Sequence, residues 1–146
     1  AYVAVMFGIH AAARGDVRTA LAPEGVDPTS PVLVSPLPAD PLSSDVIVRT
    51  ADAYRFGSHR WASSPRTRLD EAVVPETAIG PGVTEEDARA AVAAAREDRD
   101  VARYLTWSRF PHWSVEASAE GFLVRVGDAR YPGTGGLSGL SVSVPR

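Results

Sequence analysis

The hydrophobic pattern opens with an almost unbroken apolar run. Residues 1–13 are nearly all apolar, and polar residues follow up to the helix breaker Pro23. A strand of that length would be far too long, so the pattern predicts a helix over residues 1–22. The apolar run is shorter than the roughly 20 residues that span a bilayer, and it lacks the basic region of a signal peptide. Three interpretations remain open: a core helix, an oligomer contact, or the tail of a membrane helix.

The middle of the chain alternates between proline-rich and β-rich segments. Proline prevents helix and is confined to strand ends or sheet edges, so the prolines of residues 23–41 predict an extended connector with one edge strand. The β-branched and aromatic residues that follow are typical of a hairpin. In order, the pattern predicts strands over 31–36, 45–50 and 53–61, and a loop over 63–82.

The clearest helix begins at Thr84, which is followed by three acidic residues. A threonine caps exposed amides, and acids favour the positive end of the helix dipole. Small side chains then recur at Ala88, Ala91 and Ala95, which predicts close packing against a sheet. Charged residues 96–100 predict a break and the cap of a second helix. The remaining predicted elements are that helix, up to residue 107, and strands over 110–117, 121–128 and 137–144.

This order of elements predicts an α+β fold with a single, mostly antiparallel sheet. A typical sheet size gives about five or six strands, with flanking helices and an N-terminal apolar helix. The chain has 146 residues, which suits one domain. The predicted organisation is therefore an apolar helix at residues 1–22 and a single α+β domain at residues 23–146.

Composition excludes several classes of chemistry. The 15 basic and 18 acidic residues leave a net charge of −3, which gives no general attraction to nucleic acid, and we expect no nucleic-acid partner. The chain has no cysteine, so disulfides, thiol catalysis and zinc–thiolate sites are excluded. Every basic residue is arginine, which excludes a lysine Schiff base and suits bidentate pairing with carboxylates.

Glycine-rich and histidine patterns do not define a catalytic site. Residues 136–140 lack the last glycine of a nucleophile elbow, and Ser138 interrupts a dinucleotide fingerprint. The three histidines do not follow metal-ligand spacing. Two interpretations stay open: each histidine is a partly buried aromatic with a hydrogen-bond partner, or His59, His112 and Asp128 gather around zinc.

The densest chemistry lies at Arg109, His112, Asp128 and Arg130, which we take as a candidate pocket or structural polar cluster. Asp128 and Arg130 are two residues apart on the predicted strand, so they share one face. A charged pair at the end of a buried row needs compensation, and Arg109 is the expected carboxylate partner. The cluster either binds an anion or substrate, or forms a salt-bridged corner that fixes strand register. We predict no catalytic residue and no metal ligand in this chain.

Four ordered motifs carry a family resemblance. They are Pro36-Leu-Pro-Ala-Asp-Pro41, Tyr54-Arg-Phe-Gly57, the helix from Tyr104 that ends in Arg109-Phe-Pro111, and Asp128-Ala-Arg-Tyr131. Together they resemble the C-terminal soluble part of a family of bacterial inner-membrane proteins described as metal-dependent hydrolases. Asp40 stands where that family usually has asparagine.

The resemblance implies a location and a role. The opening helix would be the tail of the family's last membrane-spanning helix, and the membrane segment of the same polypeptide would be the partner. Arg14 and Arg18 follow that helix and favour the cytoplasmic side of the bacterial inner membrane. The family's metal site rests on a His-Arg…Thr-His-Ser motif that this sequence lacks. A divalent metal would therefore belong to the full-length protein, and we expect no cofactor in this chain.

The expected function is thus a non-catalytic domain that covers or positions the active site of a membrane-bound hydrolase. Two alternatives stay open at this point: a protein-interaction module unrelated to hydrolysis, and a self-contained metallohydrolase. A homo-oligomer formed through the N-terminal helix is a further expectation for the partner.

Overall fold

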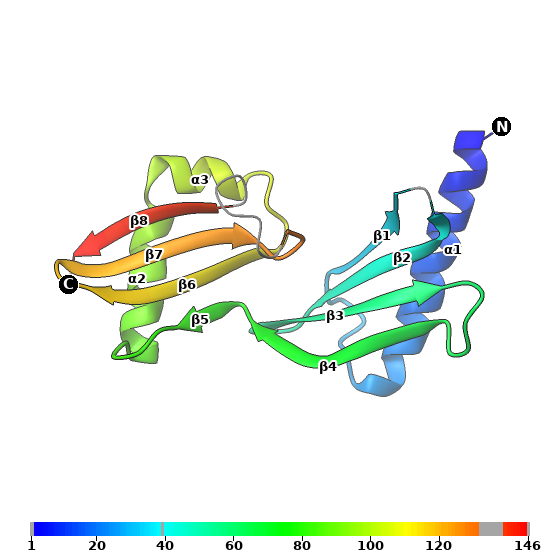
Figure 1. The fold of residues 1–146 in the computed structure, drawn as a ribbon, viewed down its shortest axis with the longest axis horizontal. Coiled ribbons are helices and arrows are strands. Elements are labelled where there is room, and N and C mark those ends of the chain that lie inside the picture. The colour runs from blue at the N-terminus through cyan, green and yellow to red at the C-terminus, as the bar shows by residue number, and fades with distance from the viewer. Residues whose placement is uncertain (1, 39, 132–138, 146) are drawn as a thin grey trace. The chain divides into compact units, whose positions relative to one another are not determined.

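The computed structural model describes residues 2–38, 40–131 and 139–145. Its residues group into two compact units, an amino-terminal unit (Ala1–Val74) and a carboxy-terminal unit (Pro75–Arg146). Each unit contains a four-stranded sheet with helix on one face (Figure 1). The boundary between the units falls inside the range 23–146 that the sequence predicts as one domain.

The amino-terminal unit packs one long helix against a sheet of order β1-β2-β3-β4. The pairs β1/β2 and β2/β3 are antiparallel, with Val34 opposite Val46 and Val46 opposite Gly57. Its elements are α1 (Tyr2–Leu21), the short 3₁₀ helix η1 (Ala22–Glu24), β1 (Val32–Leu37), β2 (Asp40–Arg49), β3 (Ala53–Arg60) and β4 (Thr67–Pro75).

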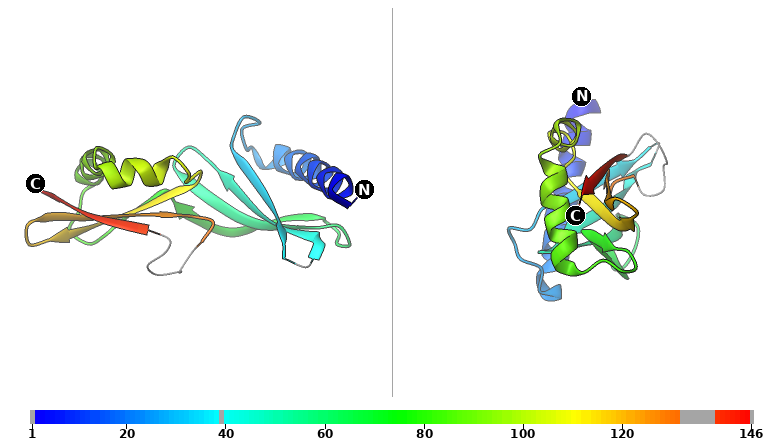
Figure 2. Two further views of the ribbon diagram at one scale, coloured as in Figure 1. Left: turned by 90° about the horizontal axis from the view of Figure 1, so that it is seen from above. Right: turned by 90° about the vertical axis from the view of Figure 1, so that its left-hand side faces the viewer.

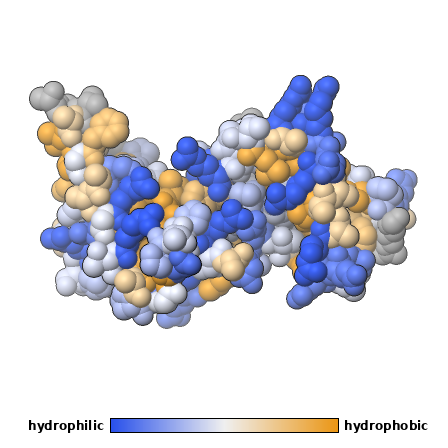
Figure 3. Space-filling model, turned by 180° about the vertical axis from the view of Figure 1, so that it is seen from behind, coloured by the Kyte–Doolittle hydropathy of each residue, from blue (hydrophilic) through white to orange (hydrophobic). Residues whose placement is uncertain are grey.

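Among the described side chains of α1, those buried in the core of this unit lie in the second half of the helix. Ala13, Val17 and Leu21 recur every four residues, so they lie on one helix face, and all are buried against the valines of β1 and β2. In the first half of α1, Val5 is 58% exposed and Phe7 is 71% exposed. Hydrophobic surface is visible near the amino-terminal end of the chain in the space-filling view (Figure 3). No helix in the described ranges combines the length and the apolar character needed to cross a membrane.

Gly57 marks a close approach between β3 and β4. A Cβ atom at this position would overlap the carbonyl oxygen of Arg68 and lie 3.0 Å from the Cα of Leu69. Real Cβ atoms rarely come so close to backbone, and backbone yields less readily than a flexible side chain. The two strands can therefore sit at this spacing because residue 57 has no side chain.

The carboxy-terminal unit has a sheet of order β5-β6-β7-β8, and α2 and α3 cover one face of it (Figure 2). The β5/β6 pair is parallel, whereas β6/β7 and β7/β8 are antiparallel. Its elements are β5 (Thr77–Ile79), α2 (Glu85–Arg96), α3 (Arg99–Leu105), β6 (Pro111–Ser118), β7 (Gly121–Asp128) and β8 (Gly139–Pro145).

The core of this unit lies between the small face of α2 and the valine-rich strands. Ala88, Ala91 and Ala95 are buried in one cluster with Trp113 and Val124. Alanine side chains add little thickness, so the helix backbone lies close to the sheet. This confirms the packing that the alanine spacing predicts.

Side-chain caps set where the two helices begin. The Thr84 hydroxyl accepts a hydrogen bond from the backbone amide of Asp87 at 3.1 Å. The Asp98 carboxylate accepts from the amides of Asp100 at 2.8 Å and Val101 at 3.1 Å. Each cap satisfies amides that the first helical turn leaves without partners. The predicted start at Thr84 and the predicted break within 96–100 are both confirmed.

The α+β class is confirmed, but the prediction of a single sheet of five or six strands is wrong. The described chain has eight strands in two four-stranded sheets. The predicted loop over 63–82 contains β4 and β5. β4 carries exposed charges such as Asp70 and Glu71 and has little buried surface, so it lacks the alternation that indicates a strand. The glycine-rich pattern at 132–138 lies outside the described residues.

Candidate functional site

Asp128 is the centre of a buried polar corner at the end of β7. The residue is 3% exposed. Its Oδ1 accepts hydrogen bonds from the backbone amide of Arg130 at 2.9 Å and from the Arg130 Nε at 2.8 Å. Its Oδ2 accepts from the Ser108 hydroxyl at 2.7 Å and from an Arg130 terminal nitrogen at 2.9 Å. Both carboxylate oxygens thus have two donors, all from two residues of the same unit.

The Arg130 guanidinium is held by aromatic rings as well as by Asp128. It lies 5.7 Å from the ring centroid of Trp107 and 5.3 Å from that of Tyr131, within the range of cation–π attraction. Trp107 in turn packs edge-on against Tyr104, with 4.7 Å between ring centroids. We call Ser108, Asp128 and Arg130, with Trp107 and Tyr131, the Asp128 corner.

The electrostatics of the Asp128 corner favour the ionised carboxylate. Burial raises the pKa of Asp128, but hydrogen bonds from the Arg130 side chain and amide and from Ser108 outweigh it, so the pKa lies below its usual value. For Tyr104, burial first and the Asp128 charge second raise the pKa of the phenol, and Arg130 opposes them. The hydrogen bond to Asp128 in turn raises the pKa of Arg130. Asp128 and Arg130 are therefore both charged at neutral pH.

The structure brings together two of the four residues predicted for this cluster. Asp128 and Arg130 pair, but Arg130 lies in the turn after β7 and folds back, whereas the sequence places both on one strand. Arg109 was expected to be the carboxylate partner. It is exposed and is not among the partners of Asp128 in the described ranges. Ser108, one residue earlier, makes that contact instead.

His112 lies on β6, apart from the Asp128 corner. It pairs opposite Gly127 and is half-buried. Burial lowers the pKa of its imidazole, and the Glu76 carboxylate opposes this shift. The neighbouring Pro111 is the residue that pairs opposite Asp128. His112 therefore belongs to the same pair of strands but does not take part in the hydrogen bonds of the corner.

His59 is fully buried in the amino-terminal unit. Its Nδ1 lies 3.0 Å from the Thr67 hydroxyl, and its ring meets Trp61 edge-on with 5.0 Å between centroids. Its Nε2 has no hydrogen-bond partner in the described part of the chain. Burial lowers the pKa of this imidazole, Asp16 raises it and Arg66 lowers it. His59 thus has the hydrogen-bond partner that the first interpretation expects, but its ring is fully buried and not partly buried.

The described residues do not contain a group of three or more histidine, aspartate or glutamate side chains arranged to hold a metal ion. His59 belongs to the amino-terminal unit, whereas His112 and Asp128 belong to the carboxy-terminal unit. Asp128 also has its oxygens occupied by donors from its own chain. The zinc arrangement of these three residues thus has no support from the geometry of either unit.

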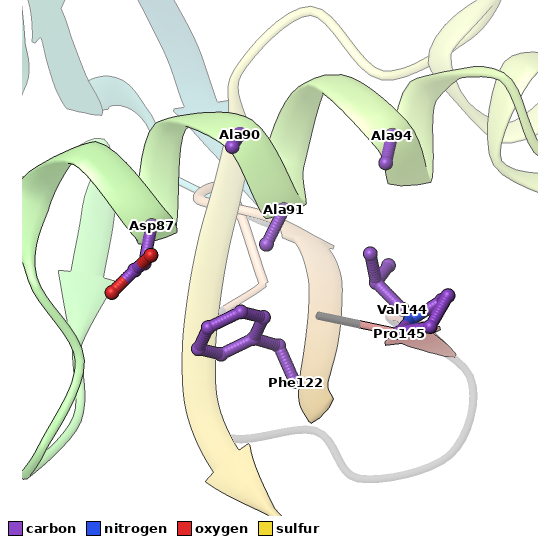
Figure 4. A pocket seen from close by; sticks show the side chains of 7 residues that line it. All are labelled: Asp87, Ala90, Ala91, Ala94, Phe122, Val144 and Pro145. Atoms are coloured by element: carbon purple, nitrogen blue, oxygen red, sulfur yellow. The ribbon is translucent and has the colours of Figure 1, made fainter. Parts of the chain in front are cut away.

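A separate groove of about 340 Å³ lies between α2 and the ends of β7 and β8 (Figure 4). Its walls are mainly apolar, and one acidic side chain lies at the start of α2. None of the four predicted site residues contributes to it. Of the three alanines that the sequence predicts to pack against a sheet, Ala91 lines this groove. The lining residues are Asp87, Ala90, Ala91, Ala94, Phe122, Val144 and Pro145.

Comparisons with protein-family models, with curated proteins and with solved structures found no match to this chain.

Proposed function

We propose that this chain is a non-catalytic domain of a membrane-bound metal-dependent hydrolase, which covers or positions the active site of the membrane segment of the same polypeptide. The observation that carries the non-catalytic part is the Asp128 corner. A general base or metal ligand needs an oxygen that substrate or metal can reach. Both oxygens of Asp128 instead accept hydrogen bonds from Ser108 and Arg130, so the corner supports a structural role.

The two halves of α1 support the attachment part of the proposal. Ala13 and Val17 are buried and fasten the second half of the helix to its sheet. Val5 and Phe7 in the first half expose more than half of their surface. Residues two apart on a helix point to different sides of it, so this segment exposes apolar side chains around its axis, which suits contact with a membrane or another segment. In this proposal, α1 is the rigid connection between the sheet and the membrane segment.

The charges that follow the apolar half support a cytoplasmic placement. Arg14 is exposed, and Arg18 donates a hydrogen bond to the carbonyl oxygen of Pro28 at 2.7 Å. Arginines next to the end of a membrane helix are characteristic of the cytoplasmic side. In the proposal, the domain therefore lies at the cytoplasmic face of the inner membrane.

Vesicle binding tests the attachment. The chain is mixed with vesicles of phosphatidylethanolamine and phosphatidylglycerol and sedimented. We expect the wild type to sediment with the vesicles and the Val5→Ser/Phe7→Ser variant to stay in the supernatant. The matched control is Leu42→Ser/Val73→Ser, which removes two apolar side chains of similar exposure elsewhere in the unit and should bind like the wild type. Equal vesicle binding by the two double variants would contradict the attachment.

Hydrolysis assays test the non-catalytic part. The isolated chain is incubated with ester and phosphoester substrates in the presence of Zn²⁺, Mn²⁺ or Mg²⁺. We expect turnover no faster than in buffer with the same metal. Metal-dependent turnover that disappears in the Asp128→Asn variant, while the variant remains folded by circular dichroism, would overturn the proposal.

A further inference from the structure

The sheet of the carboxy-terminal unit ends at β8. β7 pairs with one side of this strand, and no described strand pairs with the other. Such an edge presents backbone amide and carbonyl groups to any further strand. Proteins usually protect an edge with charged side chains, especially lysine. β8 runs from Gly139 to Pro145 without a charged residue. Its edge therefore has no electrostatic protection against strand pairing.

The sequence of β8 is complementary to itself. Leu140, Val142 and Val144 alternate with Ser141 and Ser143. The three apolar residues pair with the apolar residues of β7 on the face that α2 and α3 cover, and the serines lie on the other face. Leu140 and Val142 stay half-buried there, because the strand is the last of its sheet.

An antiparallel copy of β8 centred on Val142 matches every position. In this register Leu140 lies opposite Val144 and Ser141 lies opposite Ser143. Gly139 lies opposite Pro145, whose nitrogen has no hydrogen to donate. Apolar residues face apolar residues on the helix-covered side, and serines face serines on the other. A shift of one residue would place serine opposite an apolar residue throughout. A shift of two keeps the apolar and serine faces matched but leaves two residues of each strand unpaired, so the register centred on Val142 gives the longest matched pairing.

The groove between α2 and β8 gives independent support. Val144 and Pro145 form one wall of it, and Ala90 and Ala94 leave it open along the helix (Figure 4). In the register centred on Val142, Leu140 of a second copy lies opposite Val144 on the helix-covered side. The second copy therefore brings an apolar side chain to the wall of an apolar groove.

We propose that two copies of this chain associate through antiparallel β8 strands about a twofold axis at Val142. The two four-stranded sheets then form one sheet of eight strands, with the helices of both copies on the same face. The interface is isologous, since the same surface is used by both partners. It is separate from α1, which carries the proposed membrane attachment.

Two double variants that differ at a single position test this pairing. Both contain Ser141→Glu, and the glutamate lies beside Arg125 of the same chain in either case. One also contains Ser143→Glu and the other Ser143→Lys. Across the twofold axis, position 141 of one copy faces position 143 of the other. The first variant thus places like charges opposite each other twice, and the second places opposite charges there.

Sedimentation velocity over a range of concentrations provides the measurement. We expect a concentration-dependent dimer for the wild type and the glutamate–lysine variant, and a dimer Kd about tenfold higher for the glutamate–glutamate variant. A wild type that stays monomeric up to about 1 mM would overturn the proposal. So would equal Kd values for the two variants. A dimer lost in Val5→Ser/Phe7→Ser would overturn it too, because the contact would then lie on α1.

Oxidative cross-linking provides a second measurement. The chain has no cysteine, so Val142→Cys introduces a single thiol at the proposed axis. Facing residues of antiparallel strands have Cα atoms about 4.5–5.5 Å apart, which a disulfide can bridge. Arg125→Cys, exposed on β7, is the control. We expect a covalent dimer for the first variant and not the second. Equal cross-linking of both would overturn the proposal.

Discussion

Replacing Asp128 with asparagine removes the negative charge of the Asp128 corner and keeps the shape of the side chain. The oxygen of the new amide can still accept from the Arg130 backbone amide and Nε, if it occupies the position of Oδ1. The nitrogen of the new amide would then face a terminal nitrogen of Arg130, which is also a donor. The substitution therefore replaces a charge-assisted hydrogen bond with a contact between two donors and leaves Arg130 without its counterion.

The expected loss follows from the burial of the two partners. Hydrogen bonds to a charged group contribute about 1.5–3 kcal/mol each, and breaking a fully buried ion pair costs about 3–5 kcal/mol. The Asp128 side chain is inaccessible, but the Arg130 side chain remains 24% exposed. Water can therefore solvate part of the guanidinium after the change. We expect Asp128→Asn to lower the free energy of unfolding by about 2 kcal/mol.

Urea unfolding at neutral pH measures this loss. The control is Glu116→Gln, which removes the partner of Arg125 in a pair whose side chains are both about half exposed. Exposed pairs contribute at most about 1 kcal/mol, so the control should change the stability little. Trp113 is buried in the same unit and reports its unfolding by fluorescence. A loss for Asp128→Asn no larger than that of the control would refute the reasoning.

The stability lost in Asp128→Asn should also depend on pH in a definite direction. Because the folded pKa of Asp128 lies below its usual value, the charged form stabilises the fold above the unfolded pKa of about 3.9. That stabilisation is lost as the pH falls through the folded pKa. The difference between wild type and Asp128→Asn should therefore be constant near neutral pH and shrink under acid conditions. A difference that grows on acidification would contradict the assigned ion pair.

Three further changes are checked by unfolding measurements. Gly57→Ala should cost about 1–3 kcal/mol through overlap with β4, whereas Gly8→Ala, in open space on α1, should raise the stability slightly; equal effects would contradict the close approach. Thr84→Ala should cost about 1 kcal/mol, and Thr84→Ser should retain the cap; equal losses would contradict a hydroxyl cap. His59 has a lowered folded pKa, so its neutral form stabilises the fold above about pH 6.5, and this is lost as the pH falls through the folded pKa. His59→Asn should flatten that acid loss, and an unchanged slope would argue against it.

The helices could be predicted from the sequence because their boundaries depend on local interactions. Thr84 and Asp98 each bond to amides two or three residues ahead, and the alanine stripe of α2 follows helical spacing. Such features need no knowledge of distant segments. The caps and the packing face were therefore visible before any tertiary contact was known.

The number of sheets could not be predicted in the same way. β4 is a strand because its backbone is hydrogen-bonded to β3, whereas its own side chains are largely exposed. A strand that buries little on either face carries no hydrophobic alternation, and Pro65 and Pro75 suggest a loop. β5 has three residues and lies parallel to β6, a pairing between segments separated by two helices. Neither element has a local pattern that favours a strand.

The Asp128 corner was predicted in position but not in its partners. The two-residue spacing placed Arg130 near Asp128, although Arg130 lies in the turn after β7 and not on the strand. The rule that a buried charge needs compensation named Arg109, but the further donor is Ser108. The choice between Ser108 and Arg109 depends on the direction of side chains in the irregular segment between α3 and β6. If the backbone there were turned by one residue, side chain 109 would face inward and side chain 108 outward. Residue type alone favours arginine as the partner of a carboxylate. The structure selects the serine hydroxyl, because residue 108 is the one that faces inward.

The two halves of α1 explain why three interpretations of the opening helix fitted the sequence. The first half is the more apolar, and Arg14, Asp16 and Arg18 lie in the second, yet among the described side chains of α1 those buried in the core come from the second half. Burial of apolar surface contributes about 25 cal/mol per Å², so an exposed Phe7 adds little to folding, whereas a truncated Val17 leaves a cavity. Folding and attachment are then separable: Val5→Ser/Phe7→Ser should keep the wild-type Tm and lose vesicle binding, and Val17→Ala should lower the Tm. A fall in Tm for the first variant equal to that of the second would assign the whole helix to the core.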